Sequence, residues 1–264
     1  MDATEKLAPN ALLLDRKHMP FVLDRGAAGR AAIGLIMLST DHTLEYEWRR
    51  IFGTLDGVAV YHSRIPSPVR IAPGTLGAME AEISGATELL LPGETMDVVG
   101  YACTSGTIVI GEEKVFARIR AARPAAKCTT PITGAIAGLK ALGARRIAML
   151  TPYVDAINAM MRDFVLKQGI DVPVLGSYNH ENDNEVARID AASVRAAVLE
   201  LGRHPAVDAV FVACTSIRVA ELVATLEAEL GKPVTSSNHA MAWHALRLAG
   251  IADPLPRWGR LFTV

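Results

Sequence analysis

The sequence predicts an α/β protein built from two similar lobes, each a parallel sheet with helices on both faces. Short apolar runs alternate with stretches of helical periodicity along most of the chain. In addition, one phrase occurs twice: "DVVGYACTSGT" at 97–107 and "DAVFVACTSIR" at 208–218 share Asp, Val, Ala, Cys, Thr and Ser at the same places. Strand–helix alternation indicates a parallel α/β fold, and the repeated phrase indicates that the fold is duplicated.

The predicted strands are the apolar runs at 31–38, 58–65, 97–103, 146–152, 171–178, 208–214 and 232–237. Most of the stretches between them are rich in Ala, Leu, Glu and Arg, and several end in Gly, as helices do. Because the strands are continuously apolar, we expect them to be covered on both faces. We expect an N-terminal arm at 1–30, a first lobe at 31–140 and a second at 141–264, with the last segment packing back onto the first lobe. The arm is expected to pack on the other lobe or on a neighbouring subunit.

The composition excludes several classes of partner. The 264 residues carry 27 Lys+Arg against 28 Asp+Glu and only 5% aromatic residues, which argues against nucleic acid and polybasic membrane contacts. Charges interrupt the N-terminus, and no run approaches the roughly 20 apolar residues of a spanning helix, so we expect a soluble, cytoplasmic protein. The sequence contains no C-x-x-C, H-E-x-x-H, G-x-G-x-x-G or Walker motif, so we expect neither a metal nor a cofactor.

Two of the three cysteines are the candidate catalytic residues. Cys103 and Cys214 each end a predicted strand, at the edge of a parallel sheet where ligands bind. A helix beginning there would lower the thiol pKa through its dipole and free N–H groups. The third, Cys128, lacks this context and is expected to be structural. The residues expected to hold a substrate carboxylate beside the two thiols are Thr104, Ser105, Gly106, Thr215 and Ser216.

Opposed thiols around a small carboxylate suggest two reactions. One sulfur can remove a proton from a carbon while the other delivers one to the opposite face, which inverts the centre. Alternatively, Cys103 can add to a double bond as a thiolate, allow rotation and leave, while Cys214 donates or recovers the proton. A non-catalytic protein that binds a small metabolite is the rival interpretation, but such a protein has no need of paired thiols.

The motifs in order along the chain resemble a known superfamily. They include "IGLIMLSTDHTLE", "GYACTSG", "TTPITGAIAGLKALGARRIAMLTPY", "NDNEVARID" and "PVTSSNHAMAWHALRLAGI". From about Ile33 to Phe262 the sequence resembles the aspartate/glutamate racemase superfamily, in the branch of maleate cis–trans isomerases and arylmalonate decarboxylases. This resemblance implies a cofactor-independent enzyme with one cysteine from each lobe, acting as a homodimer or higher homo-oligomer. The decarboxylases carry glycine in place of Cys103, so decarboxylation is disfavoured but stays as an alternative.

The resemblance also implies further substrate-binding residues. Tyr153 matches a tyrosine that helps to hold the substrate carboxylate, and Asn184 lies near an asparagine with the same task, with Asn182 as a competitor. Asp41 stands where maleate isomerases carry asparagine, so it would suit an ammonium or amide N–H, or it caps the following helix. This departure and the arm are similar to a subgroup from ectoine-utilisation operons, which implies an amino-acid-derived substrate. Ser236, Ser237 and Asn238 form a strand-end loop expected at the same cleft. Both a maleate-type isomerase and a racemase of an amino-acid derivative remain open.

Overall fold

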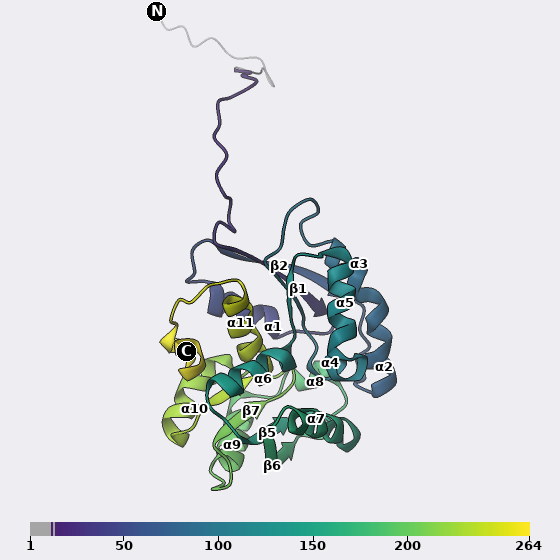
Figure 1. Ribbon diagram of the computed structural model, residues 1–264, viewed down its shortest axis with the longest axis vertical. Coiled ribbons are helices and arrows are strands. Elements are labelled where there is room, and N and C mark those ends of the chain that lie inside the picture. Colours follow the sequence, from purple (N-terminus) through teal and green to yellow (C-terminus); the bar gives the residue numbers. More distant parts are fainter. Residues whose placement is uncertain (1–11, 13) are drawn as a thin grey trace, which may run out of the picture.

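The computed structural model describes residues 12 and 14–264, which form two α/β halves (Figure 1). The first sheet has the order β2-β1-β3-β4, with β2 at Val58–Ile65, β1 at Ala31–Leu38, β3 at Val98–Tyr101 and β4 at Lys127–Thr129. The second has the order β6-β5-β7-β8, with β6 at Asp171–Ser177, β5 at Arg146–Thr151, β7 at Ala209–Val212 and β8 at Val234–Ser236. Every pair of neighbouring strands is parallel. The predicted α/β fold with two equivalent sheets is therefore confirmed.

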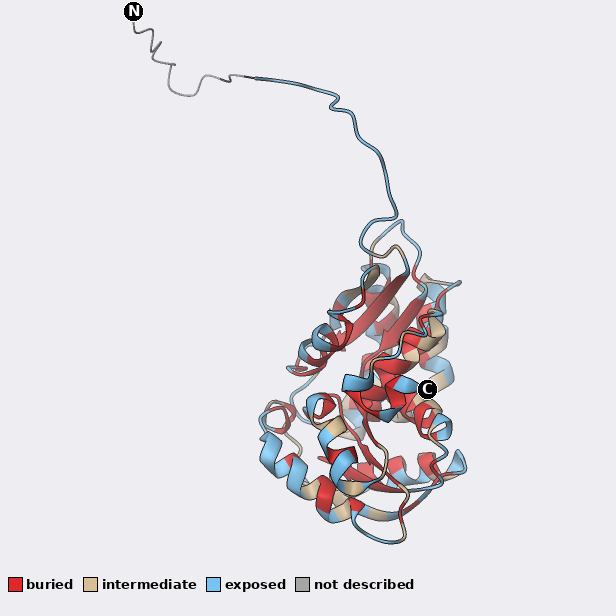
Figure 2. Ribbon diagram, turned by 90° about the vertical axis from the view of Figure 1, so that its left-hand side faces the viewer, coloured by how far each residue is buried: buried red, intermediate tan, exposed pale blue. Residues whose placement is uncertain are grey.

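Helices connect the strands. In the first half these are α1 (Leu44–Phe52), α2 (Pro73–Ala78), η1 (Met79–Glu82), α3 (Ile83–Glu88), α4 (Thr104–Ile110), α5 (Glu112–Ala122) and α6 (Pro131–Ala141). In the second half they are α7 (Asp155–Lys167), α8 (Asp183–Val186), α9 (Ala191–Gly202), η2 (Ala220–Leu222), α10 (Val223–Leu230), α11 (Ser237–Leu248), η3 (Pro256–Trp258) and η4 (Arg260–Thr263). The inner strands lie buried between helices whose outer faces are exposed (Figure 2). The edge strands β2 and β6 are only partly covered.

Two parts of the first half escaped prediction from the sequence. Strand β4 has only three residues, which is too short for an apolar run to stand out between the flanking helices. The segment from α2 through α3 is a chain of short turns, six, four and six residues long, without sustained helical periodicity. Cys128 lies in β4 and is buried, in keeping with a structural residue.

The helix that follows the last strand of each sheet joins the two halves. Helix α6 follows β4, α11 follows β8, and the two pack against each other, while α11 also contacts α1, β3 and β4 of the first half. The contact is close: a Cβ on Gly134 would lie 2.8 Å from the carbonyl oxygen of Ala240 and from Cα of Met241. Glycine at this position of α6 therefore permits the backbone of α11 to approach.

The N-terminal arm was expected over residues 1–30, and residues 1–11 and 13 of it lie outside the described residues. Residue 12 and residues 14–27 are all exposed, and the segment runs away from both halves (Figure 1). Packing begins at the end of the arm, where Ala28 contacts the core and Arg30 pairs with Asp253. No helix among the residues that the structure describes is long and apolar enough to cross a membrane.

Candidate active site

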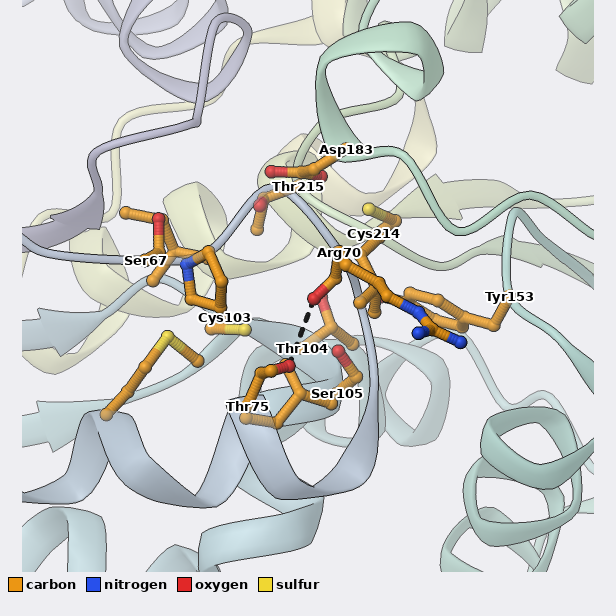
Figure 3. Close-up of a pocket in the computed structure, with 15 residues that line it drawn as sticks. Ser67, Arg70, Thr75, Cys103, Thr104, Ser105, Tyr153, Asp183, Cys214 and Thr215 are labelled. Carbon is orange, nitrogen blue, oxygen red and sulfur yellow. Dashed lines mark hydrogen bonds between the residues drawn. The ribbon is translucent and has the colours of Figure 1, made fainter.

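The carboxyl ends of both sheets meet at one small cavity of about 30 Å³ between the halves. This is the edge at which parallel sheets bind ligands. The cavity contains both repeated cysteines (Figure 3). Its 15 lining residues are Leu38, Ser67, Pro68, Arg70, Ile71, Thr75, Leu76, Met79, Cys103, Thr104, Ser105, Tyr153, Asp183, Cys214 and Thr215.

Cys103 is held by the start of a helix, as the sequence predicted. It is the N-cap of α4, and its Sγ accepts a hydrogen bond from the backbone N–H of Gly106 at 3.2 Å. A Cβ on Gly106 would lie 2.7 Å from that sulfur, so any larger residue would displace the thiol. Gly106 therefore serves the site through close backbone approach rather than by lining the cavity.

Cys214 is held differently, because the helix that we expected to begin directly after it does not form there. The chain instead turns, with Cys214 at a φ of 94°, and the next helical residues are η2 at Ala220–Leu222. The Sγ accepts from the backbone N–H of Ser216 at 3.4 Å, and the Cys214 N–H donates to Ser237 Oγ at 3.0 Å. A positive φ of this size is strained for a residue with a Cβ, so contacts around the turn must hold it.

The expectation that the site lowers the thiol pKa values is wrong for this structure. Burial raises the pKa of Cys103 to about 12, and it also raises the pKa of Cys214. The negative charge of Asp183 raises the pKa of both thiols further, whereas the N–H groups of Gly106 and Ser216 only partly oppose the effect. At neutral pH both thiols are therefore protonated in the structure as it stands.

Ser237 joins the two cysteine phrases. Its Oγ accepts from the Cys214 N–H and lies 2.8 Å from the Thr104 Oγ1 of the first half. Thr104 is thus turned toward Ser237, while Ser105 and Thr215 also line the cavity. Ser216, predicted alongside them, donates its hydroxyl to Asp183 Oδ1 at 2.7 Å and does not line the cavity.

Tyr153 follows β5 and lines the cavity, with its side chain almost completely buried. Burial raises its pKa well above the ordinary value, and the neighbouring Cys214 and Cys103 raise it further. The phenol is therefore protonated, next to both sulfurs, and able to donate a hydrogen bond to a substrate oxygen.

Asp183 and Arg70 are cavity residues that the sequence did not single out. Asp183 Oδ2 accepts from Thr40 Oγ1 at 2.6 Å, and its carboxyl group is buried between the halves. Arg70 lies at the rim, with Nε 3.0 Å from Oε2 of the exposed Glu181. Backbone bonds from Ile71 to Glu181 and from Asp183 to Val69 pair these two loops, one from each half. They were missed because polar loops give no periodic signal of which side chain turns inward.

Besides Gly106 and Ser216, two further predicted substrate-binding residues lie outside the cavity. Asn184 Oδ1 is 2.8 Å from His42 Nε2 at the surface, and the competitor Asn182 caps α8. Asp41 Oδ1 accepts from the N–H groups of Thr43 and Leu44, both at 2.8 Å, as a residue capping α1 would. Its Oδ2 is buried without a hydrogen-bond partner. The structure therefore turns Asp183, rather than its neighbours in the loop, toward the thiols.

Helix α1 positions the turn that carries Cys214. Thr43 Oγ1 donates to the Ser216 carbonyl at 2.8 Å, and Glu47 Oε1 accepts from the N–H groups of Val219 and Ala220 at 2.6 and 2.7 Å. Glu47 Oε2 accepts from Asn238 Nδ2 at 2.8 Å. Burial raises the pKa of Glu47 to about 7. The first half therefore supplies several of the contacts that hold the turn around Cys214 in the second half.

Within the described residues, no group of three or more His, Cys, Asp or Glu side chains could hold a metal ion. What the site does offer is two buried thiols, a protonated phenol and several hydroxyl and backbone donors. This set of groups suits proton transfer at, or thiol addition to, a small carboxylate.

The chain is similar to known decarboxylases and isomerases. The family model for arylmalonate decarboxylase matches residues 84–262. Arylmalonate decarboxylase of Bordetella bronchiseptica is 34% identical over 137 residues, which span 51% of this chain and 57% of that protein. Maleate isomerase of Pseudomonas putida is 25% identical over 242 residues, covering 88% of this chain and 96% of that protein.

A solved structure resembles both halves together. Nocardia farcinica maleate cis–trans isomerase, in a mutant with a covalently bound succinylcysteine intermediate, superposes with a TM-score of 0.79 at 25% identity. The match covers 88% of this chain and 98% of that one. The fold of both halves is therefore shared with an enzyme in which a succinylcysteine intermediate has been trapped.

Proposed function

Since the chain belongs to the arylmalonate decarboxylase family, we propose that it is a cofactor-independent isomerase that acts on a small carboxylate through Cys103 and Cys214. One observation carries this proposal: thiols from the two copies of one phrase line the same cavity. The similarity to maleate isomerases over 88% of the chain supports isomerisation, and the covalent succinylcysteine in a similar structure supports a direct role for cysteine.

In the addition route, the sulfur of Cys103 bonds to one carbon of the double bond and its proton passes to Cys214, which gives its own proton to the neighbouring carbon. The single bond rotates, Cys214 takes a proton back from that carbon and returns one to Cys103, and the sulfur leaves as the double bond reforms. Tyr153, Ser105 and Thr215 are the side chains we assign to the substrate carboxylates. Preorganised donors of this kind contribute roughly 3 kcal/mol each to stabilising developing negative charge.

In the proton-transfer route, the thiolate of one cysteine takes the hydrogen from the carbon beside the carboxylate. The other thiol then gives its proton to the opposite face, so that the centre is inverted and one thiol and one thiolate remain. No oxidant or reductant is needed. The two thiols exchange roles when the enantiomeric substrate binds.

The test is turnover in D2O followed by NMR and chiral chromatography. Maleate and a panel of chiral small carboxylic acids are incubated with the wild-type protein and with the Cys103→Ser, Cys214→Ser and Cys128→Ser variants. Inversion must introduce deuterium at carbon, whereas addition and elimination need not. Activity that survives both Cys103→Ser and Cys214→Ser would disprove the proposed function, and Cys128→Ser serves as the matched control.

Decarboxylation is a second candidate because the 34% identical relative is an arylmalonate decarboxylase. Loss of CO2 leaves a carbanion that needs a single proton donor, and Cys214 could supply it. The apolar wall formed by Leu38, Leu76 and Met79 would accept an apolar substituent. Release of CO2 from an arylmalonate that persists in Cys103→Ser but not in Cys214→Ser would favour this candidate.

A further inference from the structure

The charges at the cavity suit a zwitterion better than a dicarboxylate. Arg70 and Asp183 are the charged side chains among the 15 that line it. Arg70 pairs with Glu181 at the exposed rim, whereas Asp183 is only 5% exposed and lies deep in the site. A substrate therefore meets a cation at the entrance and an anion beside the thiols.

Asp183 has hydroxyl donors but no cation. Thr40 Oγ1 and Ser216 Oγ donate to its two oxygens at 2.6 and 2.7 Å. Among the residues that the structure describes, no Lys, Arg or His lies within ion-pair distance of this carboxylate. Burying a carboxylate without a counter-charge costs free energy. A cationic ligand beside Asp183 would supply that counter-charge and would therefore bind favourably.

A second carboxyl group, that of Asp41, is buried near Asp183. Asp41 Oδ2 has no hydrogen-bond partner, and the side chain is only 4% exposed. Burial raises the pKa of Asp41, and the charge of Asp183 raises it further. Behind them, Glu47 is also buried, and its pKa is raised by burial and by Asp41. Their raised pKa values favour the neutral forms of Asp41 and Glu47, and neither residue lines the cavity, so Asp183 is the carboxylate that a substrate meets.

We propose that Asp183 is the specificity-determining residue of this site and that it selects a substrate with an ammonium group beside its carboxylate, an α-amino acid or an amine-bearing derivative of one. The proposal rests on the proposed two-cysteine isomerase and names its substrate class. The ammonium lies against Asp183, and the carboxylate faces Tyr153, Ser105 or Arg70. The apolar wall of Leu38, Leu76 and Met79 takes the side chain. With this class of substrate the reaction is inversion at the carbon that bears the ammonium.

The same placement explains how a buried thiol could become reactive. In the structure as it stands, the charge of Asp183 opposes ionisation of both sulfurs. An ammonium group bound between them and Asp183 neutralises that charge and favours a thiolate. The thiolate removes the hydrogen of the ammonium-bearing carbon, the electron pair moves into the carboxylate, and the opposite thiol returns a proton to the other face. A neutral or anionic substrate would lack this effect.

The experiment compares matched pairs of acids that differ only in ammonium against hydroxyl. Alanine and lactate, aspartate and malate, and leucine and 2-hydroxyisocaproate are incubated in D2O with the wild-type protein, with maleate as a further substrate. Deuterium at the α-carbon and loss of optical purity give kcat/KM for each acid. The variants are Asp183→Asn, which keeps the shape and an acceptor for the Thr40 or Ser216 hydroxyl, and Glu181→Gln as the control in the same loop.

We expect at least one amino acid to react on the order of 100-fold faster than its hydroxy acid, and Asp183→Asn to remove that preference, because a buried charge pair is lost. Glu181→Gln should keep the preference within about twofold. Since each result is a ratio of two substrates on one protein, partial unfolding of a variant does not alter it. An unchanged ratio in Asp183→Asn would overturn the proposal.

Two other outcomes separate this proposal from the proposed function. Turnover of maleate or of hydroxy acids that is lost in Cys103→Ser, without turnover of any amino acid, would overturn the role of Asp183 and leave the two-cysteine isomerase standing. Absence of turnover with every member of the panel would overturn both.

Discussion

The two copies of the Ala-Cys-Thr-Ser phrase fold differently although their letters agree. At Cys103 the backbone is extended, with a φ of −142°, and a helix starts at once. At Cys214 the φ is 94°, and the chain turns before η2 begins at Ala220. Local hydrogen bonds thus place the first sulfur, whereas contacts from Thr43, Glu47 and Ser237 place the second. An identical local sequence can therefore deliver the same atom to one site by two different routes.

The largest expected effect tests whether the two thiols contribute equally to catalysis although their backbones differ. We expect Cys103→Ala and Cys214→Ala each to lower kcat by about 10²–10⁴-fold, as loss of an acid or base does. The measurement is steady-state turnover of the best substrate by wild type and both variants, with Cys128→Ala as the control. Losses that differ by more than tenfold between the two variants would show that the copies carry unequal chemical tasks.

The next effect concerns the support of the second copy by Glu47. Its folded pKa of about 7 lies above the ordinary value of 4.5, so the native state holds the proton more tightly. The unfolding free energy should therefore fall by about 3 kcal/mol as the pH rises from about 4.5 to 7, and then level off. Urea unfolding of wild type and Glu47→Gln across this window measures it, and the variant should lose the fall. Glu45→Gln, on the same helix but exposed beside Arg64, should retain it.

A smaller effect is expected at the hydroxyl that links both copies. Ser237→Ala leaves the buried Cys214 N–H and the Thr104 hydroxyl without their partner, which should cost about 2 kcal/mol of unfolding free energy. Chemical denaturation measures the change. Ser84→Ala, which removes a hydroxyl bound to the Arg118 carbonyl at the surface, should stay within about 0.5 kcal/mol of wild type. Equal losses in the two variants would mean that Ser237 does not hold the second copy in place.

The smallest effect compares glycine at the two cysteine positions. Both substitutions remove a buried side chain, but only position 214 has a positive φ, which glycine adopts freely. We expect Cys214→Gly to destabilise the fold less than Cys103→Gly by about 1–2 kcal/mol, the usual cost of a left-handed residue with a Cβ. Thermal unfolding of both variants gives the difference. The reverse order would show that the turn at 214 is not strained.

The sequence predicts the fold well because buried strands leave a pattern of their own. The strands at 31–38 and 58–65 agree with β1 and β2 to the residue, since β-rich apolar runs are uncommon outside sheets. The cap at Cys103 was expected because an apolar strand gives way there to Thr-Ser, although α4 itself consists of weak helix formers. Strand β4 did not follow, because three residues carry no periodicity.

The site was harder to predict because tertiary contacts decide it. "NDNE" at 182–185 places four polar side chains together, and only packing between the halves turns Asp183 inward and Asn184 outward. Nothing in the phrase around Cys214 reveals the turn, because the groups that hold it come from α1 and α11. Likewise, helix-end reasoning predicts a lowered thiol pKa, and only the buried position of both sulfurs reverses it.

The contact of α6 with α11 bears on how this chain can be divided. Gly134 and Ala240 are each the fourth residue of their helix, and a Cβ on Gly134 would collide with the carbonyl oxygen of Ala240. A patch that meets its own counterpart is the signature of a twofold dimer interface. In this chain the two helices that meet are α6 and α11, and one carries glycine where the other carries alanine. In a homodimer both helices would have the same residue at this place. Expressed as separate polypeptides, the two halves would need each other's final helix, so neither is expected to work as an independent unit.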